Sequence, residues 1–522
     1  MRRQPRSLPP SVLFRACRRG GPPRKQRSTQ MKHASMAFRR PPVRSMAFAL
    51  TLLAGLPALA GEPRWPPPAP APAVVQPDLQ APAPTRRRQT TADFRAPAAS
   101  VCSDTPRMRE VPDPDPQPPE RVREIPTLVG KVPHRRELHE MAPPPPPPAA
   151  MIAVDAAVRV SEVADARAAS SPPAMQRPAT PVTAGVVDDN ADFGGFRQFL
   201  QRHPEAARLG RDVSVRQRLR VVDAQGRPVP DAEVAVSAAN GARMWARTDA
   251  GGQAWLHLNA FDDLDSASYR VDVRRAGQQA RAQLRRGQKD ALEVRLPTAA
   301  AIPRARLDLV FMVDATGSMG DEIDKLRASL RDIVRGIEQL PSRPDVCLGL
   351  VTYRDRGDEY FVRSWDLTGN VAAFQQVLDG VRAGGGGDMP EAMNEAFAHA
   401  VQALDWRGPA TTRLLVSLAD APPHMDYPPP HYDQTMLAAL GKGIKVFSVA
   451  ASGQDTTGEI VQRQIAQYTG GRFIFLTYKV ASDPGSGPGR ETVHDVADYS
   501  VDTLDALVLR LVREELAQLP QG

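Results

Sequence analysis

Cysteine is scarce in this chain, with 3 residues among 522. Cys17 lies near the N-terminus, Cys102 in a proline-rich region and Cys347 in a segment with strand character. No cysteine follows the apolar run at 46–60 closely enough to carry a lipid anchor. We expect Cys347 to pack as a small buried apolar residue. The sequence leaves a pairing of Cys102 with Cys347 open, and unpaired thiols are the working expectation.

Acidic residues are absent from residues 1–60, which contain 13 Lys or Arg. The basic stretch leads into an apolar run at 46–60 that ends in Ala58-x-Ala60. A basic region, a short apolar run and a small-residue cleavage site are typical of a secretory signal peptide. At about 15 residues the run is too short to span a bilayer comfortably. An ordinary N-terminal helix is the alternative interpretation.

The positive charge of the chain resides in this leader. The whole chain carries +8, so residues 61–522 carry 8 − 13 = −5. The loss of basic character removes the case for nucleic acid as a partner. We therefore predict a secreted or periplasmic (cell-envelope) protein with no nucleic-acid partner and no transmembrane span after signal cleavage.

Several signatures of enzymes are missing. The chain has no metalloprotease helix motif, no nucleophile elbow, no Cys–His pair, and neither the phosphate loop nor the catalytic loop of kinases. His424 and His431 lack a third nitrogen or sulfur ligand at suitable spacing for zinc. We expect no enzyme activity and treat both histidines as loop residues.

Proline, by contrast, is abundant, and most of the 53 prolines fall within the first 185 residues. Residues 61–190 are rich in Pro, Ala and Arg, with few aromatic residues and no repeating period. Such a segment cannot bury enough apolar surface to offset the entropy of ordering. We predict a disordered or partly polyproline spacer there, followed by a short packed helix at 192–202.

Short alternating segments occupy residues 205–298, separated by turn residues every 8–12 positions. This spacing predicts a β-sandwich. The expected strands are 213–222, 233–237, 253–258, 269–274 and 292–296. The string from Val222 to Val236, followed by Thr248 to Gly252, resembles carboxypeptidase-regulatory-like and related Ig-like modules. The resemblance implies a spacer or binding domain.

Residues 304–518 alternate between apolar strand candidates and amphipathic helix candidates. Expected strands are 307–313, 346–353, 413–419, 444–450 and 472–476, and expected helices are 321–340, 371–381, 390–404, 432–440, 458–468 and 503–516. This alternation predicts an α/β domain with a doubly wound, mostly parallel, Rossmann-like sheet. The fold class is therefore multidomain.

Oxygen-bearing side chains follow the first of these strands. The apolar run stops at Asp314, and Thr316 and Ser318 follow at alternate positions. Ligands bind beyond the carboxyl ends of strands in open α/β sheets. Carboxylates and hydroxyls are hard donors suited to Mg²⁺ and Mn²⁺. We predict a cation site at this edge of the sheet.

Two further loops complete a recognisable pattern. Four glycines lead into Asp388, Pro390 and Glu391, and Asp420-Ala-Pro-Pro-His424 ends another strand. With the first loop, they resemble the von Willebrand factor type A family and its metal-ion-dependent adhesion site. Thr316 replaces the family's first Ser and keeps its hydroxyl.

The resemblance implies a ligand set and a partner. The metal ligands would be Asp314, Thr316, Ser318, Asp388 and Asp420, and the cofactor would be Mg²⁺ (or Mn²⁺ or Ca²⁺). A cation held by few charged ligands attracts a further carboxylate. The partner would therefore be a protein that offers an Asp or Glu side chain.

Local alternatives exist for some of these residues. Asp388, with Pro390 and Glu391, also fits an N-cap, a helix-starting proline and a capping-box Glu. Ser318 could cap the following helix, and Asp420 could cap a turn. The Arg-Gly-Asp triplet at 356–358 is weak evidence for a recognition motif, because three residues of common types occur together by chance.

The function we predict is capture of a protein partner through a divalent cation. One alternative is a metal-dependent hydrolase, in which Asp314, Asp388 and Asp420 hold a water-activating metal. Another is a structural envelope protein with a degenerate site. A chaperone-like subunit of a metal-insertion or ATPase complex would be cytoplasmic, which the signal peptide disfavours.

Overall fold

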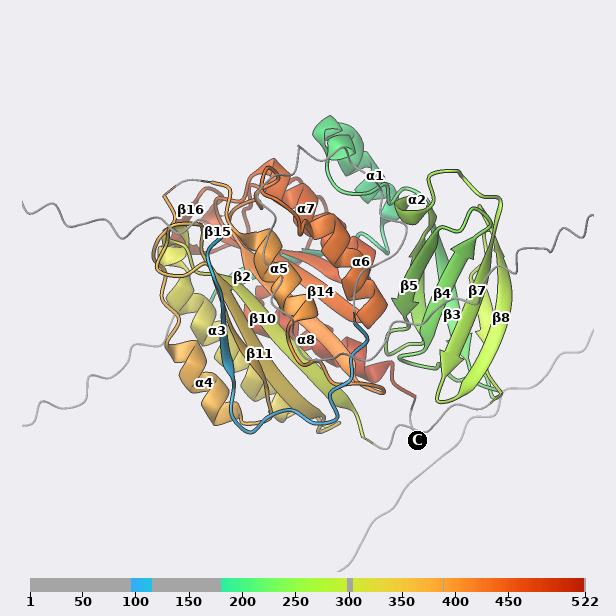
Figure 1. Ribbon diagram of the computed structural model, residues 1–522. Coiled ribbons are helices and arrows are strands. Elements are labelled where there is room, and N and C mark those ends of the chain that lie inside the picture. The colour runs from blue at the N-terminus through green and yellow to red at the C-terminus, as the bar shows by residue number, and fades with distance from the viewer. Residues whose placement is uncertain (1–94, 115–179, 298–303, 388, 521–522) are drawn as a thin grey trace, which may run out of the picture. The chain divides into compact units, whose positions relative to one another are not determined.

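The computed structural model describes residues 95–114, 180–297, 304–387 and 389–520 (Figure 1). The predicted signal peptide at 1–60 lies outside the described residues, as does most of the predicted spacer. Within the described part of the chain, no helix is both long and apolar enough to cross a membrane.

Five parallel strands form the centre of a large sheet. In spatial order they are β11 (Asp345–Tyr353), β10 (Arg306–Asp314), β13 (Thr412–Ala419), β14 (Ile444–Ala450) and β15 (Arg472–Val480). All five were expected from the sequence. Their runs are apolar because both faces of the sheet are covered. In β10, for example, Leu309 and Phe311 point into one core while Val310 and Met312 point into the other.

Six helices cover the two faces, and all six predictions are confirmed. One layer holds α3 (Ile323–Glu338), α4 (Val371–Asp379) and α8 (Leu504–Ala517), and the other holds α5 (Met393–Gln402), α6 (Tyr432–Lys442) and α7 (Thr456–Thr469) (Figure 1). Each helix turns an apolar stripe toward the sheet.

The edges of the sheet are antiparallel, so the predicted mostly parallel sheet is in fact mixed. β12 (Val362–Thr368) pairs antiparallel with β11, and β2 (Thr183–Val187) pairs antiparallel with both β15 and β17 (Val501–Thr503). β16 (Asp483–Pro488) also pairs antiparallel with β15. The link from β11 to β12 is short, and a short link can join only antiparallel neighbours.

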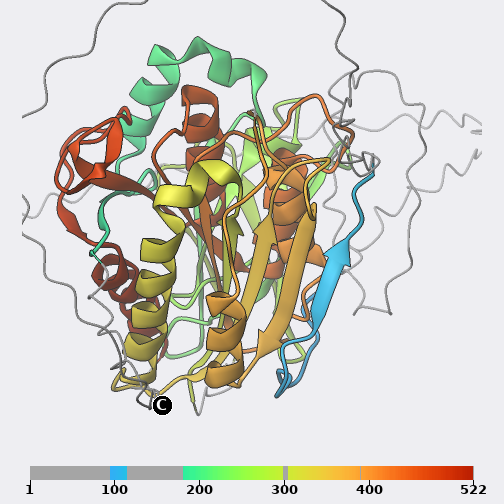
Figure 2. The ribbon, with the colours of Figure 1, turned by 90° about the vertical axis from the view of Figure 1, so that its left-hand side faces the viewer.

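Two segments of the predicted spacer are ordered, and the prediction of disorder is wrong for them. β1 (Met108–Val111) adds to the outer edge of β12 (Figure 2), and β2 lies near the opposite edge of the sheet, between β15 and β17. The prediction of disorder rested on composition, because a segment of this composition cannot bury a core of its own. An edge strand needs only backbone hydrogen bonds to a sheet that already exists.

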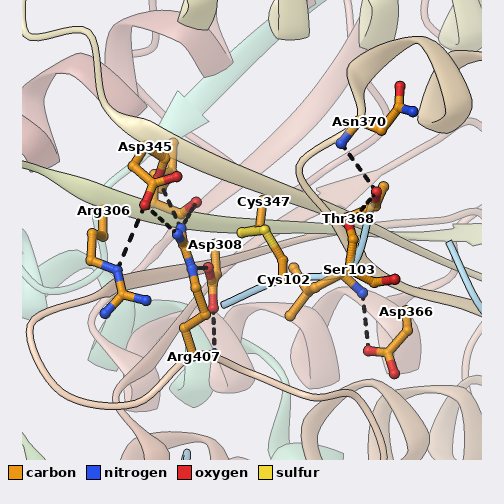
Figure 3. Close-up of a disulfide and its surroundings, with 12 residues drawn as sticks. Cys102, Ser103, Arg306, Asp308, Asp345, Cys347, Asp366, Thr368, Asn370 and Arg407 are labelled. Atoms are coloured by element: carbon orange, nitrogen blue, oxygen red, sulfur yellow. Dashed lines mark hydrogen bonds and ion pairs between the residues drawn. A yellow bond between two sulfur atoms is a disulfide. The ribbon is translucent and has the colours of Figure 1, made fainter. Parts of the chain in front are cut away.

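A disulfide ties the first of these segments to the sheet, which corrects the expectation of unpaired thiols. Cys102 is bonded to Cys347 of β11 (Figure 3). Cys347 is fully buried, as expected. The two residues are 245 positions apart in the sequence, so the pairing depends on where the N-terminal segment docks.

The β-sandwich is confirmed, with two strands more than expected. One sheet runs β6 (Gln253–His257), β3 (Arg216–Val222), β9 (Leu292–Arg295), and the other runs β5 (Arg243–Arg247), β4 (Glu233–Ala238), β7 (Ser268–Arg275), β8 (Gln278–Arg285). β5 and β8 were not predicted. β8 is rich in Arg and Gln, and β5 is a five-residue strand with Arg at both ends. Helix α1 (Phe193–Arg202) forms close to the predicted span.

Candidate metal centre

The first loop of the site follows β10. Asp314 and Thr316 are fully buried, whereas Ser318 is exposed. The backbone N–H and the hydroxyl of Thr316 donate to Asp314 Oδ1 over 3.0 and 2.7 Å. The Thr316 and Ser318 hydroxyls lie 3.0 Å apart. The loop therefore gathers three oxygen-bearing side chains beyond one strand end.

Asp420 reaches the same place from the neighbouring strand. Val313 of β10 is paired with Leu418 of β13, so Asp314 and Asp420 emerge at the same sheet edge. Burial, followed by the charge of Asp420, raises the pKa of Asp314 to about 7. Burial also raises the pKa of Asp420 to about 6, although a hydrogen bond from Ser318 opposes the shift. Two buried carboxylates thus lie close enough to repel each other, and no cationic side chain of the described residues lowers the pKa of either.

The glycine loop is joined to the first loop by backbone hydrogen bonds. Gly384 N–H donates to Ala315 O over 3.0 Å, and Gly317 N–H donates to Gly385 O over 2.9 Å. Gly385 has φ +73°, and a Cβ there would lie 2.2 Å from the Asp358 carboxylate. Only glycine fits such a position. The run of glycines therefore lets this loop lie directly against the Asp314 loop.

The structure shows that neither Glu391 nor Ser318 caps the helix that follows it. Helix α5 begins at Met393, and its N-cap residue Ala392 makes no side-chain cap, so Glu391 closes no capping box for it. Asp388 itself lies outside the described residues, and its role as a ligand stays a prediction. Ser318 lies inside a short 3₁₀ helix (Gly317–Asp321), and α3 has Glu322 at its N-cap position. Capping of α3 therefore does not explain Ser318.

Glu391 is a site residue that the sequence interpretation missed. Its side chain is buried, and a Cβ on Gly386 would lie 3.1 Å from its Oε1 and 3.2 Å from Thr316 Cβ. Burial, followed by the charges of Asp314, Asp355, Asp358 and Asp420, raises its pKa to about 9. A Glu just after a proline has the same local sequence whether it caps a helix or enters a site, so no local signal could separate the two.

Strand β11, which pairs with β10, contributes Tyr353 and the adjoining Arg354 to the surroundings of the site. Tyr353 is paired with Asp314, and burial, followed by the charges of Asp314, Asp420 and Glu391, raises its pKa well above the usual value. The next residue, Arg354, is buried and donates from Nε to Ala315 O over 3.2 Å and from a terminal nitrogen to Arg382 O over 3.2 Å. Arg354 thereby fixes the first loop relative to the chain entering the glycine loop.

The Arg-Gly-Asp triplet serves the site structurally. Asp358 Oδ2 accepts from Gly386 N–H over 2.8 Å and from Asp355 N–H over 3.0 Å. The Arg356 guanidinium lies 3.5 Å from the centre of the Tyr427 ring. Gly357 N–H donates to Asp113, which follows the N-terminal strand β1. The triplet is thus held by its neighbours and is not a free recognition loop.

His424 and His431 make oxygen contacts. His424 Nε2 lies 3.1 Å from Asp355, Nδ1 lies 3.2 Å from Asp426, and the ring stacks on Tyr427 at 3.6 Å. Burial alone would lower the pKa of His424, but its hydrogen bond to Asp355 and the nearby carboxylates raise it. His431 Nε2 lies 2.8 Å from Tyr427 O. Both rings lie in or beside the loop that follows Asp420.

The donor set fits a hard divalent cation. Three buried carboxylate oxygens, Asp314 Oδ2, Asp420 Oδ1 and Glu391 Oε2, have no hydrogen-bond partner among the residues that the structure describes. Buried polar atoms are normally paired, so unpaired oxygens in one cluster call for an explanation. No three His, Cys, Asp or Glu side chains of the described residues are placed to hold a metal. A cation here would need the hydroxyls of Thr316 and Ser318 as well as carboxylates.

Comparison with known families identifies both domains. The von Willebrand factor A domain family matches residues 308–426, and the carboxypeptidase regulatory-like domain family matches residues 218–297. The chain therefore contains a von Willebrand factor A domain preceded by a carboxypeptidase regulatory-like, Ig-like domain. The α/β domain extends beyond the matched region: β14 and β15 belong to its sheet, and α8 to one of its helical layers.

Similar proteins share only part of the chain. An ariadne-like RING finger protein of Acanthamoeba polyphaga mimivirus is 32% identical over 121 residues, which are 23% of this chain and 12% of that protein. The alpha-protein kinase vwkA of Dictyostelium discoideum is 28% identical over 137 residues, 25% of this chain and 21% of the kinase. The chain thus spans less than a quarter of either relative.

Among solved structures, the pilus adhesin SpaC from Lactobacillus rhamnosus GG matches 39% of this chain and 29% of its own. The sequence identity is 14% and the TM-score is 0.25.

Proposed function

We propose that this protein binds a protein partner through a divalent cation held at the edge of its von Willebrand factor A domain. The observation that carries the proposal is the pair Asp314 and Asp420. Each has a buried carboxylate oxygen that no described residue hydrogen-bonds, beside the hydroxyls of Thr316 and Ser318. Domains of this family commonly bind proteins.

The side chains at this edge of the sheet would have different roles in binding the ion. Thr316 holds Asp314 Oδ1, which leaves Oδ2 to face the site. Asp314, Thr316, Ser318 and Asp420 would be ligands, with Asp388 as a further one. A bound Mg²⁺, Mn²⁺ or Ca²⁺ would supply an electrophilic position for an Asp or Glu carboxylate of the partner. Without a cation, Glu391 has a pKa of about 9 and so holds its proton at neutral pH.

We place the protein outside the cytoplasm, in the periplasm, in the cell envelope or secreted. The Cys102–Cys347 disulfide supports this, because disulfides persist in oxidising compartments and are rare in the cytosol. The leader at 1–60, with its basic region and small-residue cleavage site, supports it independently.

Thermal unfolding of the whole chain tests the cation site. Adding Mg²⁺ to one hundred times its Kd should stabilise the wild type by about 2.7 kcal/mol, which is roughly 5–10 °C in Tm. Asp314→Asn should abolish the rise, because it removes a charged ligand. Without cation, the variant should be at least as stable as the wild type, because it also removes a buried charge.

The matched control is Asp332→Asn, which removes an exposed carboxylate on α3 and should keep the full response. A wild type whose Tm ignores 10 mM Mg²⁺, Mn²⁺ and Ca²⁺ would contradict the proposal. Cation-dependent turnover of peptide or phosphate-ester substrates, lost in Asp314→Asn, would favour the hydrolase instead.

Cation affinity should also depend on pH. The pKa values of Asp314 and Asp420, about 7 and about 6, exceed the ordinary value of 3.8. The folded protein therefore holds these protons more tightly than the unfolded chain, and without cation it loses stability as the pH rises from about 4 to 7. Because a cation must displace the protons, its apparent Kd should weaken by at least about tenfold between pH 8 and pH 5. Calorimetric titration at both pH values measures this, and equal affinity would contradict it.

A further inference from the structure

A second polar site lies far from the cation site. A cavity of about 310 Å³ opens between the hairpin joining β7 to β8 and Pro409, which precedes β13. Its charged lining consists of Asp231, Glu233, Arg247, Arg274 and Arg275. Pro409 and Asp420 stand at opposite ends of β13, an 8-residue strand, or about 25 Å apart. The cavity is therefore independent of the cation site.

Positive charge exceeds negative charge at this place. Asp231 Oδ1 accepts from Arg247 over 3.0 Å and from Arg413 over 2.9 Å. Glu233 accepts from Arg247 and from Arg274. Two carboxylates thus serve three guanidinium groups, and both are already engaged. Arg275 is a fourth.

Arg275 lacks a direct ion-pair partner within the described part of the chain. It is partly buried, and among the described residues its guanidinium makes no hydrogen bond or ion pair, although it lines the cavity. Burial lowers its pKa; Asp231 offsets part of that effect, and the charges of Arg247 and Arg413 lower the pKa further. A buried charge is ordinarily paired. The carboxylates whose charge acts on Arg275, Asp231 and Glu233, are hydrogen-bonded to other arginines. Arg275 therefore lines the cavity with a charge that is only partly compensated.

We propose that this cavity binds a small molecule carrying an oxyanion, either phosphate or carboxylate, with Arg275 as the principal contact. A guanidinium is a planar fork that pairs with two oxygens of such a group. The volume is at the lower end of the range for ligand pockets, which fits a small anion rather than a polymer segment. Bound there, the anion would lie against both the β-sandwich and the loop before β13.

Calorimetric titration of the whole chain in low-salt buffer with EDTA tests the proposal, because EDTA removes any contribution from the cation site. The probes are inorganic phosphate and malonate, one for each oxyanion. At least one should bind with a Kd below about 1 mM. Arg275→Gln should weaken that binding by tenfold or more and leave the Tm unchanged within about 1 °C, because the Arg275 guanidinium makes no hydrogen bond or ion pair with the described residues.

The matched control is Arg285→Gln, the same exchange at an exposed position of β8 in the same sheet. It should leave the affinity unchanged. The proposal is overturned if the wild type shows no saturable binding of either anion at 10 mM, if Arg275→Gln keeps the wild-type affinity, or if Arg285→Gln loses as much as Arg275→Gln. The last result would mean that general positive charge attracts the anion.

Discussion

Replacing Arg407 by methionine is expected to lower the free energy of unfolding by about 3–5 kcal/mol. Arg407 is 1% exposed, and its Nε donates to Asp308 Oδ1 over 2.5 Å (Figure 3). Its terminal nitrogens donate to Asp345 Oδ2 and Leu307 O, each over 2.9 Å. Asp308 is fully buried. Loss of the guanidinium would leave that carboxylate charged in the core.

The size of the loss should depend on pH. Burial already raises the pKa of Asp308, although the charge and hydrogen bonds of Arg407 oppose the shift. Without Arg407 the pKa must rise further, so Asp308 in the variant can take up a proton at mildly acidic pH. The stability deficit of Arg407→Met should therefore be larger at pH 8 than at pH 5, since a raised carboxyl pKa costs stability as the pH rises. Urea denaturation of the whole chain at both pH values measures it.

Two variants control this experiment. Adding Asp308→Asn to Arg407→Met should restore part of the stability, because the unpaired charge is gone. Arg335→Met removes an exposed guanidinium on α3 and should change stability by no more than about 0.5 kcal/mol. A deficit below about 1 kcal/mol for Arg407→Met would show that the network is not a determinant of stability.

Loss of the Cys102–Cys347 disulfide should produce the second large effect. The bond closes a loop of 245 residues, and the chain-entropy account assigns about 5.5 kcal/mol to a loop of that length. Reduction should also release β1 from β12, whose edge would then be open. We expect the Tm to fall by roughly 10 °C and amide exchange in Val362 to Trp365 to accelerate.

The matched control is Cys102→Ser combined with Cys347→Ser, which should start at the lower Tm and ignore reductant. Calorimetry with and without dithiothreitol measures both proteins, and mass spectrometry reports the thiol state. A wild type that keeps its Tm after both thiols are shown to be free would contradict the prediction.

The local pattern of apolar and polar residues was sufficient to predict much of the fold. The central strands and covering helices of the α/β domain were predictable because apolar periodicity reports which faces of an element are buried. The loop of Asp314, Thr316 and Ser318 was predictable for a related reason. Parallel strands end at one edge of a sheet, so Asp420 was expected at the same edge as Asp314. That β13 lies directly beside β10 was decided by the tertiary structure.

Other features depend on contacts between residues far apart in the chain. β1 and β2 form because a sheet built from later residues offers them open edges, and Cys102 meets Cys347 only once β1 has docked. Neither composition nor periodicity carries that information, since both describe a segment without its partners.

The residues of the two proposed sites also divide into those that local sequence reveals and those that only distant contacts reveal. Asp314 and Asp420 were visible in the sequence, because each is a polar residue that ends an apolar run. Glu391 and Arg275 were not visible, because their roles depend on residues from other parts of the chain. Glu391 lies among carboxylates, and Arg275 lines a cavity rich in guanidinium groups. Sequence pattern records how a segment is buried, whereas the charge a buried group meets is set by residues that folding brings from elsewhere in the chain.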